Sequence, residues 1–190
     1  MLFRIRRLIM PLPPFSEATA RVVFDASSLV GALLKQGSVP ERALELARLR
    51  DIICLSKPVE EEVRSVFARP RFRHYAARAE LILAVLAAAA QVFDPGIAVT
   101  DCRDVKDNKY LELALAADAA AIVSSDQDLL VLNGWRGVAI LSPADYLRRR
   151  EIQIGAEAPC KSGSSAPASA SVGGAVAGER PQGPGASQPV

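Results

Sequence analysis

Apolar and polar positions along residues 21–150 follow two alternating patterns, one typical of buried strands and one of helices. Short continuous apolar runs predict strands buried on both faces, and the segments between them carry apolar residues at helical spacing. Such an alternation favours an α/β domain, in which a central, mostly parallel sheet is covered by helices on both faces as a three-layer sandwich. The predicted strands are RVVF (21–24), DIICLS (51–56), AAIVSSD (120–126) and GVAILS (137–142), and the predicted helices are ERALELARLR (41–50), EEEVRSVFAR (60–69), KYLELALAAD (109–118) and PADYLRRR (143–150).

The longest apolar stretch is LILAVLAAAAQVF, residues 81–93. It is shorter than the roughly 18 to 20 residues that a helix needs to cross a bilayer. We therefore predict a buried helix that leads into a further strand, and no membrane association.

The two ends of the chain differ in composition from the domain between them. Residues 1–20 carry three arginines and three prolines. The prolines interrupt the apolar run that a signal peptide needs, so we predict a flexible basic arm. Residues 151–190 are dominated by Ala, Gly, Ser and Pro. Such a segment cannot bury enough apolar surface to offset the entropy of ordering, so we predict a disordered tail after a single domain at 21–150.

Net charge and two rare residue types narrow the possible functions. The formal net charge is only +2, so overall charge does not indicate nucleic-acid binding. His74 is the only histidine, which excludes a histidine-rich zinc site within one chain and disfavours a Ser-His-Asp hydrolase. The three cysteines form no CxxC pair. They fit a reducing compartment better than a disulfide framework, which predicts a cytoplasmic location.

Asp25 raises the first functional question, because it directly follows the buried strand at residues 21–24. An ionised carboxylate is costly to bury without a compensating partner. Asp25 therefore either caps the helix that follows or binds something positive. Asp126 likewise follows the apolar run AAIV. Ligands in parallel α/β folds bind beyond the carboxyl ends of the strands, so these two acids point to a shared site.

Helical spacing places further acids relative to the core, at about 100° per residue. In PVEEEVRSVF the apolar face leaves Glu61 on the opposite side, in solvent. Glu60 and Glu62 flank that face on its two sides, and periodicity does not choose between them. In KDNKYLELAL, Asp107 lies one turn before an apolar core position and on the same side, so we expect it to face inward.

Three or four acids thus converge on one end of the predicted sheet, with no evident cationic partner among them. Like charges raise one another's pKa, so such a cluster is unstable until a cation compensates it. Oxygen-only ligands select a hard divalent cation, Mg²⁺ or Mn²⁺. Each acid also has a purely structural explanation: Asp25 and Asp128 as helix caps, Asp104 and Asp107 as first-turn acids, and residues 60–62 as a solvated face.

Four blocks of the sequence, which span about residues 21–148, carry a resemblance to a known family. The blocks are VVFDASSLVGALL, LSKPVEEEVRSVFARPRF, CRDVKDNKYLELALAADAAAIVSSDQDLLVL and GVAILSPADYL. They resemble the PIN-domain family and are similar to the VapC-like ribonucleases, the toxin components of bacterial toxin–antitoxin systems. This resemblance implies a PIN-like fold and a nuclease activity.

The resemblance also implies roles for individual residues. The distance to ARPRF selects Glu62 over Glu60 as the helical acid. Asp104 and Asp128 are accessory metal candidates. Ser124 matches a hydroxyl position of the family and Ser27 stands where asparagine is frequent, and we predict that both contact substrate. The acids that match the catalytic metal ligands of the family are Asp25, Glu62, Asp107 and Asp126.

The segment ARPRFRHYAAR, residues 68–78, interleaves arginines with aromatic residues. Arg69, Arg71 and Arg73 are candidate contacts to an RNA backbone, with an aromatic side chain stacking on a base. The alternative is a solvated helix junction with Phe72 in the core.

We therefore expect a Mg²⁺- or Mn²⁺-dependent endoribonuclease, in which activated water attacks an RNA phosphodiester. The resemblance implies a type II toxin restrained by a cognate antitoxin, and we predict a homodimer. The alternative is a catalytically silent PIN scaffold that binds RNA or protein. A receiver-type phosphoacceptor fits less well, because the domain has no lysine after residue 109, and an Asp-x-Asp phosphatase needs an acid where Ser27 stands.

Overall fold

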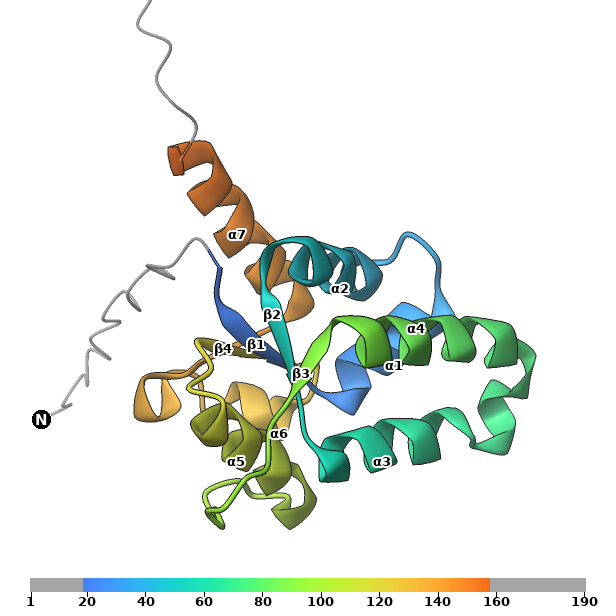
Figure 1. The fold of residues 1–190 in the computed structure, drawn as a ribbon, viewed down its shortest axis with the longest axis horizontal. Helices are drawn as coiled ribbons and strands as arrows, with labels where there is room; N and C mark the ends of the chain where they lie inside the picture. Colours follow the sequence, from blue (N-terminus) through green and yellow to red (C-terminus); the bar gives the residue numbers. More distant parts are fainter. Residues whose placement is uncertain (1–18, 158–190) are drawn as a thin grey trace, which may run out of the picture. The chain divides into compact units, whose positions relative to one another are not determined.

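Five parallel strands form one sheet in the order β3-β2-β1-β4-β5. The computed structural model describes residues 19–157. In Figure 1, α2 and α7 lie on one side of the sheet and α5 and α6 on the other. The predicted α/β fold, with a parallel sheet between helical layers, is confirmed. The strands are β1 (Arg21–Phe24), β2 (Ile52–Leu55), β3 (Ala90–Val92), β4 (Ala121–Val123) and β5 (Ala139–Leu141).

The connections between the strands are helical, as the spacing of apolar residues predicted. Each predicted helix is present, and further short helices begin next to the candidate acids. The α-helices are α1 (Ala26–Leu34), α2 (Val39–Arg50), α3 (Lys57–Phe67), α4 (Ala76–Ala89), α5 (Asn108–Ala116), α6 (Gln127–Leu130) and α7 (Pro143–Glu157), and the 3-10 helices are η1 (Pro70–Tyr75), η2 (Val105–Asp107) and η3 (Trp135–Gly137).

The core lies on both faces of the inner strands. Val22, Val23, Ile53 and Ile122 are almost completely buried. Continuous apolar runs are needed in these inner strands because helices cover both faces of the sheet there. This packing fixes the carboxyl ends of β1, β2 and β4 next to one another.

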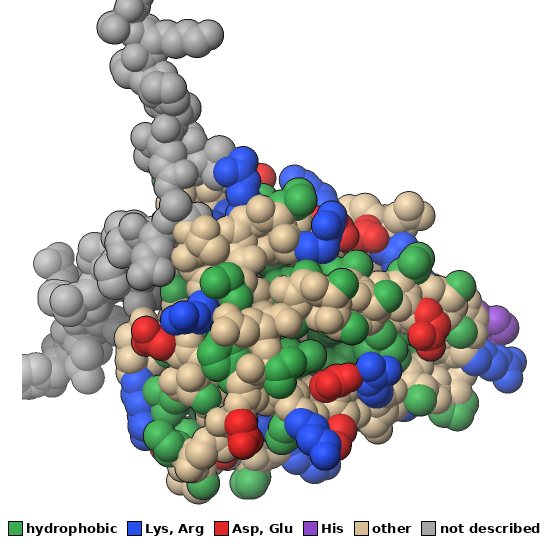
Figure 2. All heavy atoms as spheres, viewed as in Figure 1, with side chains coloured by type: hydrophobic (Ala, Val, Ile, Leu, Met, Phe, Trp, Pro, Cys, Tyr) green, Lys and Arg blue, Asp and Glu red, His purple; other side chains and the backbone are tan. Residues whose placement is uncertain are grey.

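The helix and strand predicted from residues 81–93 are present as α4 and β3, but the expected burial is wrong. Of α4 only Ala79, Ile82 and Leu86 are buried, and Leu81 is 68% exposed. β3 is an edge strand, so Val92 also lies open to solvent. Figure 2 shows hydrophobic side chains gathered over α4 and β3 on this face. An apolar run does not reveal that its strand ends up at the edge of a sheet.

At the amino ends of β1 and β2 a buried ion pair ties α7 to the sheet. Arg150 pairs with Asp51, and its Nε donates to Asp51 Oδ2 over 2.9 Å. Asp51 also accepts from the Ala20 amide and from the Tyr146 hydroxyl. The side chains of Asp51 and Arg150 are 0% and 5% exposed, so each charge is compensated inside the protein.

The domain end that the sequence predicted at residue 150 falls inside a helix. α7 continues to Glu157, past the predicted domain end at residue 150. Most of the predicted basic arm (1–20) and disordered tail (151–190) lies outside the described residues, so both stay predictions. Within residues 19–157, the helices are too short or too polar to cross a membrane.

Candidate active site

Asp25 lies at the carboxyl end of β1 and is 2% exposed. Its Oδ1 accepts from the Ser28 amide over 2.8 Å, so Asp25 caps α1. Its Oδ2 accepts hydroxyl hydrogen bonds from Ser27 (2.7 Å) and Ser124 (2.5 Å). Among the ion pairs of the described part of the chain, none includes Asp25. The carboxylate is thus a cap that also lacks a cation.

Ser124 links the acid after β1 to the acid after β4. Phe24 pairs with Val123 in the sheet, so the residues that follow them, Asp25 and Ser124, lie side by side. The Ser124 hydroxyl donates to Asp25 and accepts from the Asp126 amide over 2.9 Å. The parallel register therefore brings the two predicted acids to the same edge of the sheet.

Glu62 faces inward on α3 and Glu60 faces solvent. Glu62 Oε2 accepts from the buried Tyr110 hydroxyl and forms a 2.8 Å ion pair with Lys109 Nζ. Glu60 instead pairs with Arg64 one turn along the exposed side of the helix. The expectation that the acids lack a cationic partner is therefore wrong for Glu62. Lys109 reaches it because α3 and α5 pack side by side, which the sequence of neither helix reveals.

Asp107 ends η2 and opens α5, and its pKa is raised to about 6. Burial is the largest cause, followed by the negative charges of Asp126, Asp104, Glu62 and Asp25. Each of these acids acts on Asp107 through space, since all lie near the same edge of the sheet. The candidate acids thus form one electrostatic cluster around Asp107.

Burial also raises the pKa of Asp25, against the lowering effect of its hydrogen bonds from Ser124, Ser27 and Ser28. The hydroxyls and the amide stabilise the ionised carboxylate, but a desolvated charge still costs free energy without a cation. A site that leaves an acid in this condition favours binding of a positive ion.

Of the two acids after β4, the one that caps the next helix is not the one that the sequence suggested. Asp126, rather than Asp128, caps the next helix, with Oδ1 accepting from the Asp128 amide over 2.8 Å. Asp128 pairs with Arg103 over 2.5 Å, so it also has a cationic partner. Asp104 caps η2 by accepting from the Lys106 amide. The accessory acids Asp104 and Asp128 are therefore each held by a local contact.

The donor set suits a hard cation, although no three acidic, histidine or cysteine side chains in residues 19–157 are close enough together to hold one ion. Mg²⁺ keeps several waters and is usually bound through one or two carboxylates. A carboxylate offers about four lone-pair positions, and three donors use those of Asp25, which leaves about one. The carboxylates at this edge of the sheet that could contact the ion or its bound waters are those of Asp25, Asp107, Asp126 and Glu62.

The predicted substrate contacts lie in two places. Ser27 and Ser124 donate to Asp25, so in this structure their hydroxyls orient the acid. Arg69, Arg71 and Arg73 are exposed around η1, the turn after α3. Their contact with RNA and that of the two serines stay predictions.

The aromatic residue of the basic segment belongs to the core. Phe72 is 5% exposed, and the Arg71 guanidinium lies over its ring at 4.6 Å. Stacking of Phe72 on a base is therefore excluded, and the alternative of a helix junction anchored by Phe72 is correct for that residue. The arginines around it remain open to solvent.

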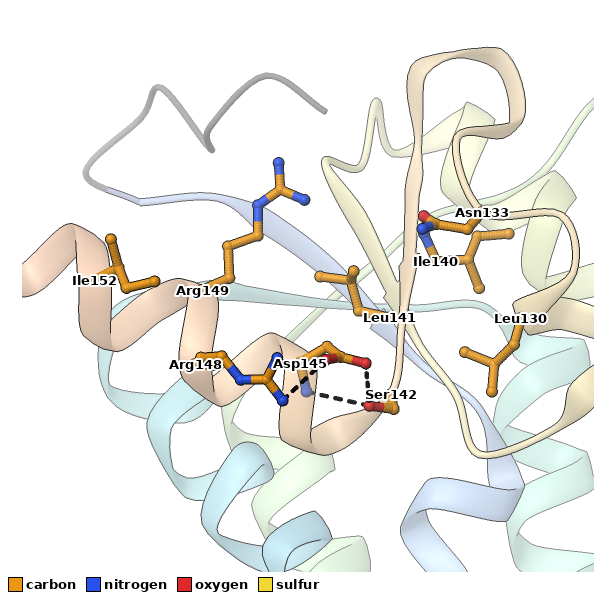
Figure 3. Close-up of a pocket in the computed structure, with 9 residues that line it drawn as sticks. All are labelled: Leu130, Asn133, Ile140, Leu141, Ser142, Asp145, Arg148, Arg149 and Ile152. Carbon is orange, nitrogen blue, oxygen red and sulfur yellow. Dashed lines mark hydrogen bonds and ion pairs between the residues drawn. The ribbon is translucent and has the colours of Figure 1, made fainter. Parts of the chain in front are cut away.

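A surface pocket beside β5 and α7 does not include any predicted site residue. Figure 3 shows Leu130, Ile140 and Leu141 at its wall. Its polar groups serve the start of α7, because Asp145 accepts from the Ser142 hydroxyl over 2.6 Å and pairs with Arg148. This pocket therefore adds no group to the acid cluster.

Tyr110 and Lys109 are the site residues that the sequence interpretation missed. Tyr110 accepts from the Ala26 amide over 3.0 Å and donates to Glu62, so it joins the start of α1 to α3. It lies three residues after Asp107, which at helical spacing is the same inward side. That spacing was the available signal for Tyr110, whereas the Lys109 contact depends on the packing of α3 against α5.

Comparison with known proteins agrees with the fold. The PIN domain model matches residues 21–128, more than half of the 190-residue chain, and the chain belongs to this family. PIN domains are in general nucleases that use divalent metal ions. The chain thus belongs to a family of hydrolases acting on nucleic acids.

Two individual proteins are similar to this chain. The uncharacterized protein MJ1680 of Methanocaldococcus jannaschii is 28% identical over 116 residues, which cover 59% of this chain and 74% of the relative. The crystal structure of VapBC2 from Rickettsia felis, bound to a DNA fragment from its promoter, is similar over 64% of this chain and 98% of that chain. Its TM-score is 0.46 and its identity 13%. A likeness at that level carries no conclusion about function.

Proposed function

We propose that this protein is a Mg²⁺- or Mn²⁺-dependent endoribonuclease that hydrolyses RNA phosphodiester bonds. The observation that carries the proposal is the environment of Asp107, whose pKa is raised to about 6 by burial and by the charges of four other acids. Asp107 forms no ion pair among the described residues, and it lies among like charges that repel it. Perturbed pKa values of this kind gather at functional sites.

In this proposal the acids bind the cation and the exposed arginines bind the RNA. Asp25, Asp107 and Asp126 offer oxygen ligands, and Ser124 fixes two of them relative to one another. A divalent cation, when bound, activates water and neutralises charge on the phosphate. Arg69, Arg71 and Arg73 contact the RNA backbone as exposed cations.

The biological role we propose is that of the toxin of a type II toxin–antitoxin pair, acting in the cytoplasm as a homodimer with a cognate antitoxin as its partner. The sequence resemblance to VapC-like ribonucleases supports this role. The toxin role predicts that expression without the antitoxin slows bacterial growth. Asp107→Asn should relieve this effect at equal protein level.

Cleavage of a structured RNA by the purified protein tests the enzymatic proposal. We expect Mn²⁺-dependent cleavage by the wild type, and loss of at least a hundredfold in rate for Asp107→Asn. The matched control is Asp94→Asn, which removes an equal charge from an exposed position after β3 and should cleave like the wild type. RNA binding without cleavage by the wild type would favour the silent scaffold.

A further inference from the structure

Lys109 and Glu62 form an ion pair inside the acid cluster. Lys109 Nζ lies 2.8 Å from Glu62 Oε2, and the two side chains are only 21% and 25% exposed. Partial burial weakens solvent screening, so this pair is stronger than an exposed one. The charge of Glu62 is thus compensated within the protein.

Tyr110 holds the same carboxylate in place. Its hydroxyl donates to Glu62 Oε2, the oxygen that Lys109 also contacts, and accepts from the Ala26 amide over 3.0 Å. Tyr110 is 2% exposed, so it cannot move without opening the core. Glu62 is therefore anchored from two sides, by a charge and by a buried hydroxyl.

The other inner acids are held differently. Asp25 accepts hydroxyl and amide hydrogen bonds, and Asp126 accepts an amide hydrogen bond as a helix cap. Neither forms an ion pair among the described residues, and the same holds for Asp107. Within residues 19–157, Glu62 is the one acid of these four that already has a cation in contact with it.

We propose that Glu62 and Lys109 are positioning residues, a charge-compensated pair that Tyr110 anchors beside the cation site. One or two of the carboxylates of Asp25, Asp107 and Asp126 contact the ion, and the remainder hold its bound waters. This inference rests on the proposed function. Its consequence is electrostatic. Glu62 cancels the repulsion between Lys109 and the ion, and it does not supply a ligand.

A four-protein cycle of Mn²⁺ binding, measured by titration calorimetry without RNA, tests this assignment. Glu62→Gln keeps a hydrogen-bond acceptor for Tyr110 but leaves Lys109 uncompensated, so Mn²⁺ should bind on the order of ten- to a hundredfold more weakly. Lys109→Met removes the opposing charge, so Mn²⁺ should bind more tightly by a similar factor. The double variant restores the net charge and should bind within about threefold of the wild type.

Two controls separate charge from folding. Lys109→Arg keeps the charge and should bind Mn²⁺ like the wild type. Lys35→Met removes an exposed lysine at the end of α1 and should leave the affinity within about twofold, because solvent screens that position. If Lys109→Met does not fold, Lys109→Gln combined with Glu62→Gln makes the same charge change and lets two amides hydrogen-bond.

The outcomes distinguish this inference from the proposed function. If the double variant binds at least tenfold more weakly than the wild type, Glu62 is a ligand and the inference is overturned, while the nuclease proposal stands. If the wild type does not bind Mn²⁺, or Asp25→Asn binds it equally well, the metal site itself is wrong and both proposals fall. Recovery in the double variant supports the assignment.

Discussion

Two buried aspartates at opposite ends of the central strands are held in opposite ways. Asp51 lies just before β2 and pairs with Arg150, while Asp25 lies just after β1 and faces other acids. Both side chains are shielded from water, so burial alone does not distinguish them. The difference lies in compensation, because one charge is balanced within the protein and the other is not.

The contrast teaches how to separate a structural acid from a functional one in this fold. Asp51 also accepts from the Ala20 amide and the Tyr146 hydroxyl, so its contacts join the starts of two strands to α7. In the part of the chain that the structure describes, the hydrogen-bond donors to Asp25 are neutral, and burial raises its pKa. A buried acid with a counter-charge stabilises the fold. A buried acid without one raises the free energy of the folded state until a cation binds.

The largest expected effect is the loss of stability when the buried ion pair between Asp51 and Arg150 is broken. Asp51→Asn leaves the Arg150 guanidinium buried without a counter-charge, which should cost about 3–5 kcal/mol of unfolding free energy in a urea titration. Replacing both partners, with Asp51→Leu and Arg150→Met, should recover part of that loss. A cost below about 1 kcal/mol would mean that the Asp51–Arg150 pair contributes no more than an exposed ion pair, and Asp51 and Asp25 would then not differ as argued.

The same substitution at the unbalanced acid should behave in the opposite way. Without metal, Asp25→Asn should keep or raise the melting temperature, because it removes repulsion and the amide oxygen still caps α1. Mn²⁺ at 100 times its Kd should stabilise the wild type by about 2.7 kcal/mol and the variant by much less. Equal stabilisation of both proteins in thermal melts would show that Asp25 is only a cap.

The pH dependence of the stability of the metal-free protein tests whether its buried acids lack a counter-charge. The pKa of Asp107 is about 6, above its ordinary value of 3.8, so the folded state retains this proton to a higher pH than the unfolded chain does. Stability in EDTA should therefore fall as pH rises from about 4 to about 6, and Asp25, whose pKa is also raised, acts in the same direction.

Asp107→Asn provides the control for that experiment. The variant has no carboxylate to ionise at this position, so denaturant melts should show a shallower decline over the same pH range. With Mn²⁺ present the wild type should gain stability as pH rises through about 6, because the ion binds the ionised carboxylate. A metal-free stability that rises over this range would contradict the assigned pKa shift.

The smallest effect is expected at an acid that is balanced but exposed. Glu60 pairs with Arg64 at 2.8 Å, with side chains 38% and 53% exposed. Glu60→Gln should cost only about 0.3–0.5 kcal/mol in a urea titration and leave Mn²⁺ affinity unchanged. A clear loss of affinity would mean that charge anywhere on α3 affects the site, and the special place of Glu62 would be lost.

Much of the fold was predictable because it depends on local spacing. Continuous apolar runs marked the inner strands, and helical spacing marked α2, α3 and α5. The edge position of β3 was not predictable, because strand order depends on contacts between distant segments. The exposed face of α4 escaped prediction for the same reason.

The positions of the acids were predictable in part. Asp25 and Asp126 could be placed at one edge because each follows an apolar strand, and parallel strands end on the same side. Helical spacing left Glu60 and Glu62 equivalent, and resemblance to the PIN family selected Glu62. The structure turns Glu62 toward Tyr110, which only the packing of α3 against α5 could decide.

By itself the sequence determined the elements, the parallel sheet and the gathering of acids at its carboxyl edge, because these follow from periodicity and chain direction. Only the tertiary structure decided which acids are compensated. Lys109 meets Glu62 across two helices, and Arg150 meets Asp51 from 99 residues away along the chain. Ion pairs form wherever the fold brings side chains together, so no local pattern records whether a buried charge has found its partner.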